Sequence, residues 1–303
     1  MSTIRITTAW TKITRFTFPR FPVFRFKMSQ SEPTDAGPDH LQRTSHNTRN
    51  PTVTSAVVTS IRQESETVKG LTLKIEDKDF TFKAGQWVDF FIPGVDVFTG
   101  YSMCSSAKKL KDENLMDLAI KYSDYPPTEW VHKECQEGSE VSIRAGGDFY
   151  YDPQPTDSTT DVLLIAGGVG INPLYSMFLH NADLHQRMKE NSDSYKPGKT
   201  TLLFSASNHS ELIFKKSILE LCKKTPNMNC QFFVTKEKHK DNFGSETSVG
   251  RINKSVLKMA LEEMKIDKVK IYICGPASMI GDIESILHSL GVNPKQIAYE
   301  KWW

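Results

Sequence analysis

The chain has 303 residues, of which 38% are hydrophobic and 24% charged, an ordinary globular composition whose length predicts two domains. Its 38 lysines and arginines nearly balance 36 acidic residues and leave a net charge of +2. Because no basic block interleaved with aromatic residues follows residue 51, this charge pattern argues against nucleic acid as a partner.

The first 51 residues are predicted to be a targeting segment and a linker. Six basic residues and many serines and threonines precede the first acid, Glu32, a composition typical of a mitochondrial transit peptide. We therefore expect a location in mitochondria, most simply the matrix. Pro19 and Pro22 count against a targeting helix, and the alternative is a disordered basic tail. Residues 32–51, polar and proline-containing, are predicted to be a linker, so folded structure should begin near Thr52.

Residues 52–155 are rich in short alternating runs that predict strands. Turn residues separate these runs at intervals typical of an antiparallel sandwich or barrel. The expected strands are 53–60, 68–75, 87–92, 116–122 and 141–145. We predict an antiparallel β-barrel as the first domain.

Residues 156–303 alternate between apolar strand patterns and helical patterns. The expected strands are 162–166, 201–205, 231–235, 269–274 and 296–300, and the expected helices are 172–187, 210–224, 252–265 and 277–290. Repeated strand–helix units predict a doubly wound parallel α/β sheet, whose ligands bind at the carboxyl ends of the strands. The boundary between the domains is expected in the polar stretch 152–161, which contains Pro153 and Pro155.

A glycine-rich turn joins the first of these strands to a helix. Its residues are Gly167, Gly168, Val169, Gly170, Ile171, Asn172 and Pro173. Glycines allow a diphosphate to approach the backbone, and the helix amino terminus offers N–H groups and a positive dipole end, so this turn predicts a dinucleotide site. The alternative is a tight α/β turn without a ligand. The same interruption excludes a membrane span over the apolar stretch 162–179.

The cysteines are odd in number, widely spaced and free of any C-x-x-C pair. They are Cys104, Cys135, Cys222, Cys230 and Cys274. This spacing argues against structural zinc and an iron–sulfur cluster, and it favours reduced thiols in a reducing compartment.

Several short motifs occur in one order along residues 53–303. They are Phe82 to Val88 (F-K-A-G-Q-W-V), Tyr101-Ser102, the glycine turn ending at Pro173, Cys274-Gly275-Pro276, and the terminus Glu300-Lys301-Trp302-Trp303. In this order they resemble the ferredoxin–NADP⁺ reductase family, in its shorter NAD(P)H-oxidoreductase branch. The resemblance implies a flavin-binding barrel followed by an NAD(P)-binding α/β domain.

The resemblance also implies roles for individual residues. Tyr101 would lie against the flavin ring and Ser102 near its N5 edge, while Cys274, with Gly275 and Pro276, would place the nicotinamide. Trp302 would cover the flavin, and Thr128 is expected to cap a helix and bond a flavin phosphate. The residues with expected catalytic roles are Ser102, Cys274 and Trp302.

Two positions depart from the family's flavin motifs. Thr99 replaces an arginine that would pair with the flavin phosphate, and Tyr125 replaces a glycine. The predicted function is an NAD(P)H-dependent oxidoreductase that passes a hydride to bound FAD and then electrons to an unknown acceptor. The alternatives are an NAD(H)-binding module that has lost productive flavin binding, and an assembly scaffold that binds neither cofactor.

The choice of cofactor rests on a few residues. The stretch 205–209 contains no arginine for a 2′-phosphate, which favours NAD over NADP. The cluster Lys236, Lys238, His239 and Lys240 could serve NADP instead, although a solvated lysine run is the simpler interpretation. Family precedent favours FAD over FMN.

Overall fold

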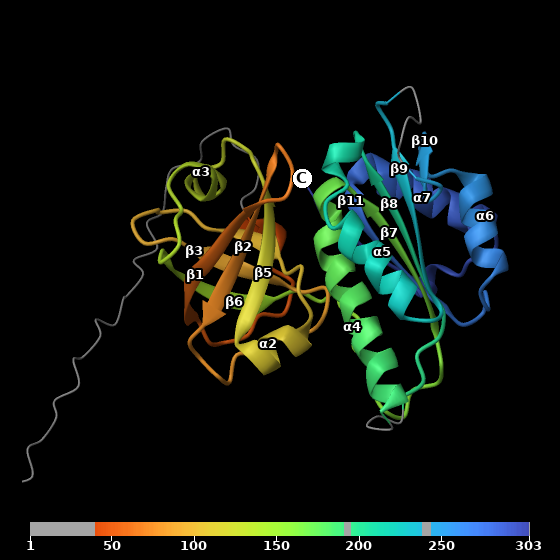
Figure 1. Cartoon of the computed structure of the whole chain (residues 1–303), viewed down its shortest axis with the longest axis horizontal. Helices are drawn as coiled ribbons and strands as arrows, with labels where there is room; N and C mark the ends of the chain where they lie inside the picture. Colours follow the sequence, from red (N-terminus) through yellow and green to blue (C-terminus); the bar gives the residue numbers. More distant parts are fainter. Residues whose placement is uncertain (1–39, 191–194, 238–243, 303) are drawn as a thin grey trace, which may run out of the picture. The chain divides into compact units, whose positions relative to one another are not determined.

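Two six-stranded sheets dominate the computed structural model, which describes residues 40–190, 195–237 and 244–302 (Figure 1). The predicted transit peptide, the residues Lys238, His239 and Lys240, Trp303, and the side chain of Trp302 lie outside the described parts. Residues 38–303 belong to one compact unit. The predicted fold is confirmed: a barrel-like antiparallel sheet precedes a parallel α/β sheet.

The first sheet has the strand order β4-β3-β6-β1-β2-β5, with antiparallel neighbours throughout. Its strands are β1 (Thr54–Gln63), β2 (Val68–Ile75), β3 (Trp87–Phe91), β4 (Thr99–Ser102), β5 (Leu115–Lys121) and β6 (Glu140–Gly146). Alternate residues such as Leu71 and Leu73 fill a buried apolar core, as a period of two requires. The sheet curls without closing as far as the structure describes it. Met103, the residue after edge strand β4, forms an isolated bridge with Leu118 of edge strand β5.

The second sheet is parallel, in the order β10-β9-β8-β7-β11-β12. Its strands are β7 (Asp161–Gly167), β8 (Thr200–Ala206), β9 (Met228–Val234), β10 (Thr247–Val249), β11 (Val269–Pro276) and β12 (Ile297–Trp302). Its helices are α4 (Ile171–Lys189), α5 (Lys215–Lys224), α6 (Lys254–Glu262) and α7 (Ala277–Ser289).

Successive residues of β7 face opposite sides of this sheet and so build two cores. Leu164 joins the core under α4 and α5, whereas Leu163 and Ile165 join the core under α6 and α7. Strand order reverses between β7 and β11, and such a switch point is where parallel α/β sheets bind ligands. The glycine turn leaves β7 at that point.

Several elements differ from the expectation. Described structure begins at α1 (His40–Arg43), before Thr52, because residues 40–50 are hydrogen-bonded and ion-paired to the first sheet. A composition-based prediction of a linker could not detect those partners. Strands β4 and β10 and helix α2 (Ala107–Glu113) were also not predicted, since each is too short for a clear period.

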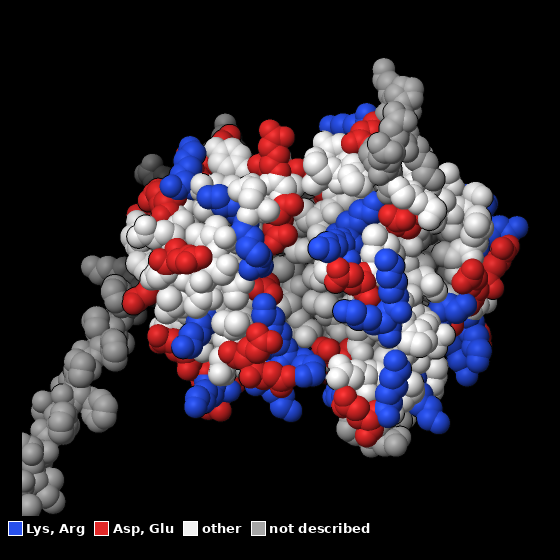
Figure 2. Space-filling model, viewed as in Figure 1, with Lys and Arg blue, Asp and Glu red and all other residues white. Residues whose placement is uncertain are grey.

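Two surface properties bear on partners. Within the described ranges, no helix has both the length and the apolarity to cross a membrane. On the face drawn in Figure 2, basic and acidic side chains are intermixed over both sheets rather than gathered into a basic stripe. Nothing in this distribution points to nucleic acid.

Candidate functional site

The glycine turn places an open backbone beside a helix amino terminus. Gly168–Gly170 form a short 3₁₀ turn between β7 and α4, and Gly168 has a φ of 56°. A Cβ built at Gly168 would meet no heavy atom within 4 Å. The Gly170 N-cap of α4 supplies no side-chain hydrogen bond to the first N–H groups. This side of the turn can therefore receive an anionic group.

The neighbouring glycines have a different task. A Cβ at Gly170 would lie 2.3 Å from the Cys274 carbonyl oxygen, and a Cβ at Gly167 would lie 2.6 Å from Met279 Sδ. These two glycines permit close packing of the turn against the end of β11. Of the predicted diphosphate residues, Gly168 alone of the three glycines faces open space.

Cys274 and Glu300 are neighbours across parallel strands. Cys274 is fully buried in β11 and pairs in register with Ala166 of β7 and Glu300 of β12. Glu300 is half-buried as a residue, yet its Oε2 atom is inaccessible and lacks a hydrogen-bond partner in the described structure. This burial raises the pKa of Glu300 to about 8. Sequence analysis gave Glu300 no role, although its place in the terminal motif marked the position.

Tyr101 and Thr128, both predicted to contact flavin, come together in the first sheet. The Tyr101 hydroxyl and Thr128 Oγ1 are 3.0 Å apart, and the Tyr101 ring packs edge-on against Phe90 at 5.3 Å between centroids. Burial raises the pKa of Tyr101, so the phenol stays neutral and can donate.

The predicted capping role of Thr128 is wrong. Helix α3 (Pro126–Lys133) has Tyr125 as its N-cap, without a side-chain hydrogen bond, and Thr128 lies inside the first turn with its N–H bonded to the Tyr125 carbonyl. Two prolines begin this helix one residue after Tyr125, and Pro suits the first positions of a helix, which fixes the cap earlier than the threonine suggested. The Thr128 hydroxyl is thereby directed to Tyr101.

Ser102 is buried with an unsatisfied hydroxyl. Only 1% of the residue is exposed, and its Oγ has no hydrogen-bond partner in the part of the chain that the structure describes. A buried hydroxyl without a hydrogen-bond partner destabilises the fold, so a ligand that offers a polar group to Ser102 Oγ would remove this penalty.

Helix α4 connects the residues predicted to bind nucleotide, at the glycine turn, with the first sheet, which carries the residues predicted to contact flavin. Asn172 Nδ2 donates to the Ala119 carbonyl of β5 at 2.6 Å, and Ser176 Oγ donates to the Ser105 carbonyl at 2.7 Å. Asn172 thus uses its amide group on the first sheet, while Pro173 is buried beside it in the first turn of α4.

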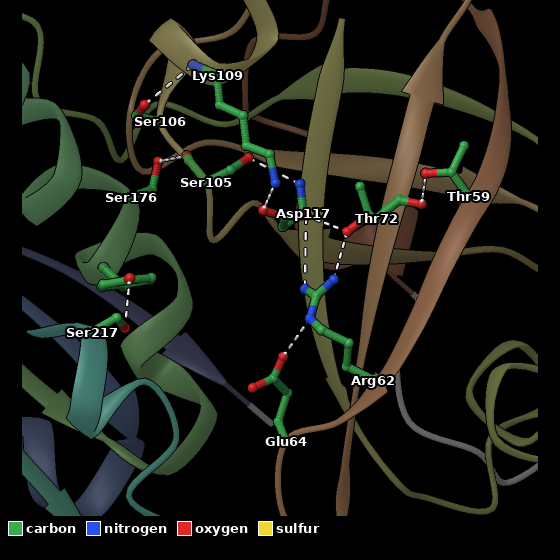
Figure 3. A network of polar contacts seen from close by, with 11 residues as sticks. Thr59, Arg62, Glu64, Thr72, Ser105, Ser106, Lys109, Asp117, Ser176 and Ser217 are labelled. Carbon is green, nitrogen blue, oxygen red and sulfur yellow. Dashed lines mark hydrogen bonds and ion pairs between the residues drawn. The ribbon is translucent and has the colours of Figure 1, made fainter. Parts of the chain in front are cut away.

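A polar network supports the loop that receives α4 (Figure 3). Ser105 Oγ accepts a bond from the Asp117 N–H at 2.9 Å, and the Asp117 carboxylate is ion-paired with Lys109 at 2.5 Å. Arg62 donates to Thr72 at 2.6 Å, and Thr72 donates to Asp117. Contacts with β2, β5 and α4 therefore hold the loop after β4 in place.

The loop after β8 is flanked by carboxylates. The His209 N–H donates to Glu237 Oε1 at 2.8 Å, and Glu211 accepts bonds from Ser65 and Thr67, which lie in the turn between β1 and β2. Lys215 is ion-paired with Glu246 at 3.0 Å. Lys121 also lies 3.9 Å from Glu211, so charges of both signs surround this loop.

Comparisons with known proteins agree with this geometry. A family model described as "Oxidoreductase NAD-binding domain" matches residues 164–285. The Danio rerio protein "Oxidoreductase NAD-binding domain-containing protein 1" is 46% identical over 268 residues, covering 88% of this chain and 97% of that protein. "NADH-cytochrome b5 reductase 2" of Neurospora crassa is 25% identical over 261 residues, covering 75% and 72%.

A solved structure shares the fold. The ferredoxin NADP⁺ reductase of Neisseria gonorrhoeae, solved with bound FAD and NADP, superposes with a TM-score of 0.64 at 18% identity, covering 84% of this chain and all of that one.

Proposed function

The chain belongs to the oxidoreductase NAD-binding domain-containing protein 1 family, and on that premise we propose that it is an NADH-dependent flavoprotein that passes a hydride from nicotinamide to bound FAD. The family and the fold support a pyridine-nucleotide oxidoreductase of the ferredoxin–NADP⁺ reductase-like superfamily. The flavin, the choice of nucleotide and the acceptor are the finer parts of the proposal.

The observation that carries the proposal is the double attachment of α4. The first turn of α4 directly follows the open glycine turn. Asn172 in this first turn of the helix donates a hydrogen bond to the Ala119 carbonyl of β5. Strand β5 is linked in turn, by the Met103–Leu118 bridge, to the end of the strand that carries Tyr101. Hydride transfer requires donor and acceptor atoms within about 3 to 3.5 Å, and a helix whose first turn is held to both sheets supports a fixed relative placement of the two sites.

The residues fit a dinucleotide at the carboxyl edge of the second sheet. The open backbone of Gly168 and the N–H groups of α4 would hold the diphosphate. Cys274, buried at the end of β11, would orient the nicotinamide by contact rather than by acid–base chemistry. The stretch 205–209 contains no arginine for a 2′-phosphate, which supports NADH over NADPH.

The residues also fit a flavin beside β4. Tyr101, held by Thr128, would contact the ring, and the unsatisfied hydroxyl of buried Ser102 offers a hydrogen bond to it. When bound, FAD would supply the two-electron chemistry, and the chain would supply orientation and exclusion of water. Thr99 leaves the phosphate without an arginine, so we expect flavin affinity weaker than an arginine fork would give. The Trp302 cover remains a prediction.

The first experiment records the visible spectrum of the full-length protein with and without added FAD, followed by anaerobic addition of NADH. Loss of the band near ~450 nm that oxidised flavin shows would support the reductase. Matched titrations with NADPH compare the two Michaelis constants, and we expect the lower value for NADH. A protein that binds NADH but takes up no flavin in excess FAD would instead be the nucleotide-binding module.

We also propose a location in the mitochondrial matrix, on the composition of residues 1–31. The acceptor would then be a separate protein or a small molecule such as a quinone. Import of carboxyl-terminally tagged protein into isolated mitochondria, with and without residues 1–31, tests the location. Equal import of both forms would refute it.

A further inference from the structure

Residues His40–Asn50, here called the N-terminal strap, are bound to the first sheet by main-chain contacts. The Asn50 N–H donates to the Ala145 carbonyl at 2.8 Å, and the Gly147 N–H donates to the Thr48 carbonyl at 2.9 Å. Arg49 and Gly146 form an isolated antiparallel bridge. The strap therefore extends the sheet at the end of β6.

The strap also supplies two partners to a buried acid in β3. Asp89 is fully buried, and its carboxylate lies 2.9 Å from His40 Nε2 and 3.1 Å from Arg49 Nε. Arg144 of β6 completes the cluster at 2.6 Å. A buried carboxylate is stable only when such partners are in place, so Asp89 depends on the strap.

The same histidine lies directly on the strand that carries Tyr101 and Ser102. Asp89 faces Gly100 across the β3–β4 ladder, and a Cβ built at Gly100 would be 2.2 Å from His40 Cε1. The three atoms nearest to that Cβ all belong to the His40 ring. Gly100 is thus the position at which the imidazole packs on the β4 backbone.

Trp87 links the strap to the next pair of the ladder. His40 packs edge-on against the Trp87 ring at 5.0 Å between centroids, and the Arg49 guanidinium lies 4.9 Å over it. Trp87 faces Ser102 across the ladder. Strap residues therefore contact the strand neighbours of both Gly100 and Ser102.

We propose that the N-terminal strap is part of the support of the flavin site, with His40 as a positioning residue that fixes β4 and so the placement of Tyr101 and Ser102. This inference rests on the proposed function. It also requires that any removal of the targeting segment leaves His40 in the mature protein, so a processed chain should begin at or before residue 40.

The test uses the full-length protein and the variants His40→Ala, Gly100→Ala and the double variant. Gly100→Ala should displace the imidazole and raise the dissociation constant for FAD roughly tenfold, about 1.4 kcal/mol. His40→Ala should weaken FAD binding less, because it removes the contact without a clash. In the double variant the clash is gone, so FAD affinity should return to that of His40→Ala, a non-additive result.

Leu257→Ala is the control for loss of stability alone. Leu257 belongs to α6 and is fully buried in the core between the second sheet and helices α6 and α7, so this change should lower Tm and leave FAD affinity unchanged. FAD affinity is measured by quenching of flavin fluorescence at a temperature well below each Tm, and NADH affinity should not vary among the variants.

The outcomes separate the two proposals. Failure of the wild-type protein to bind FAD would refute the proposed function and, with it, this one. Normal FAD binding by wild type together with unchanged affinity in Gly100→Ala and His40→Ala would refute the positioning role alone. Additive losses in the double variant would also refute it, because the two residues would then act independently.

Discussion

Replacement of Gly170 by alanine tests how the nucleotide turn is packed. The added Cβ would lie 2.3 Å from the Cys274 carbonyl oxygen, 2.5 Å from its carbon and 2.7 Å from the Gly275 nitrogen, all backbone atoms that cannot rotate away. Ordinary contact begins at 3.4 Å, so the turn or the end of β11 must retreat by about 1.1 Å, the difference between 3.4 and 2.3 Å. Overpacking of this kind costs about 1–3 kcal/mol.

We expect two measurable effects of Gly170→Ala. The free energy of unfolding should fall by that amount, which lowers Tm by a few degrees, about 2–4 °C per kcal/mol for a chain of this size class. Because Cys274 moves with the turn, hydride transfer should slow by up to about 10²-fold, the cost of an ångström-scale misplacement. Thermal unfolding and anaerobic stopped-flow reduction by NADH measure these quantities.

Gly168→Ala is the matched control. It meets no atom, but its φ of 56° is strained for alanine by about 1–2 kcal/mol. Stability should therefore fall in both variants, whereas the placement of Cys274 should change only in Gly170→Ala. Because Gly168 lines the proposed diphosphate site, the reduction rates of the two variants are compared at saturating NADH. Wild-type Tm and reduction rate in Gly170→Ala would refute the packing argument.

Three further changes have expected outcomes. Burial would raise the pKa of Asp89, but hydrogen bonds from His40 and Arg144 and the charge of Arg49 outweigh burial and hold this pKa below its ordinary value. The ionised Asp89 therefore stabilises the fold above about pH 4, and this stabilisation is lost as the pH falls. Asp89→Asn should therefore lower the free energy of unfolding by about 3–5 kcal/mol at pH 7, and the variant should lose less stability than wild type as the pH falls below about 4. An equal loss of stability in acid for both proteins would contradict this. Glu300 has a raised pKa, so stability should decline as pH rises from about 4.5 to about 8, and Glu300→Gln should remove that decline in urea titrations across the range. Cys274→Ala should slow flavin reduction and leave NADH affinity nearly unchanged; an unaltered rate would end its positioning role.

Apolar patterns predicted both sheets, apart from the short strands β4 and β10. In β7 the run Val162 to Ala166 is apolar at every position because both faces are covered, and this continuity together with the following glycines predicted the glycine turn after this strand. In the first sheet the period of two, as in Leu71 and Leu73, predicted one buried face.

Pairings between distant residues could not be predicted in this way. Asp89 gives no sign in the sequence that its partners include His40 and Arg49, since these lie 49 and 40 residues away in a polar stretch. The partner of Thr128 and the raised pKa of Glu300 likewise depend on what the fold places beside them. Local sequence patterns predict secondary structure and turns, but they do not predict the burial of a side chain by a distant part of the chain.

The two side-chain hydrogen bonds that attach α4 to the first sheet and to the loop after β4 are accepted by main-chain carbonyls, those of Ala119 and Ser105. Every residue type offers this same oxygen, so the two bonds do not depend on the side chains of the acceptor residues. Ser105 is constrained separately, because its Oγ accepts a bond from the Asp117 N–H, and Ala119 is constrained by its burial. For the attachment of α4 itself, selection would act on the donors, Asn172 and Ser176. A chimera that takes its antiparallel sheet from a distant relative should accordingly accept this helix as long as the backbone path of the receiving strand is kept.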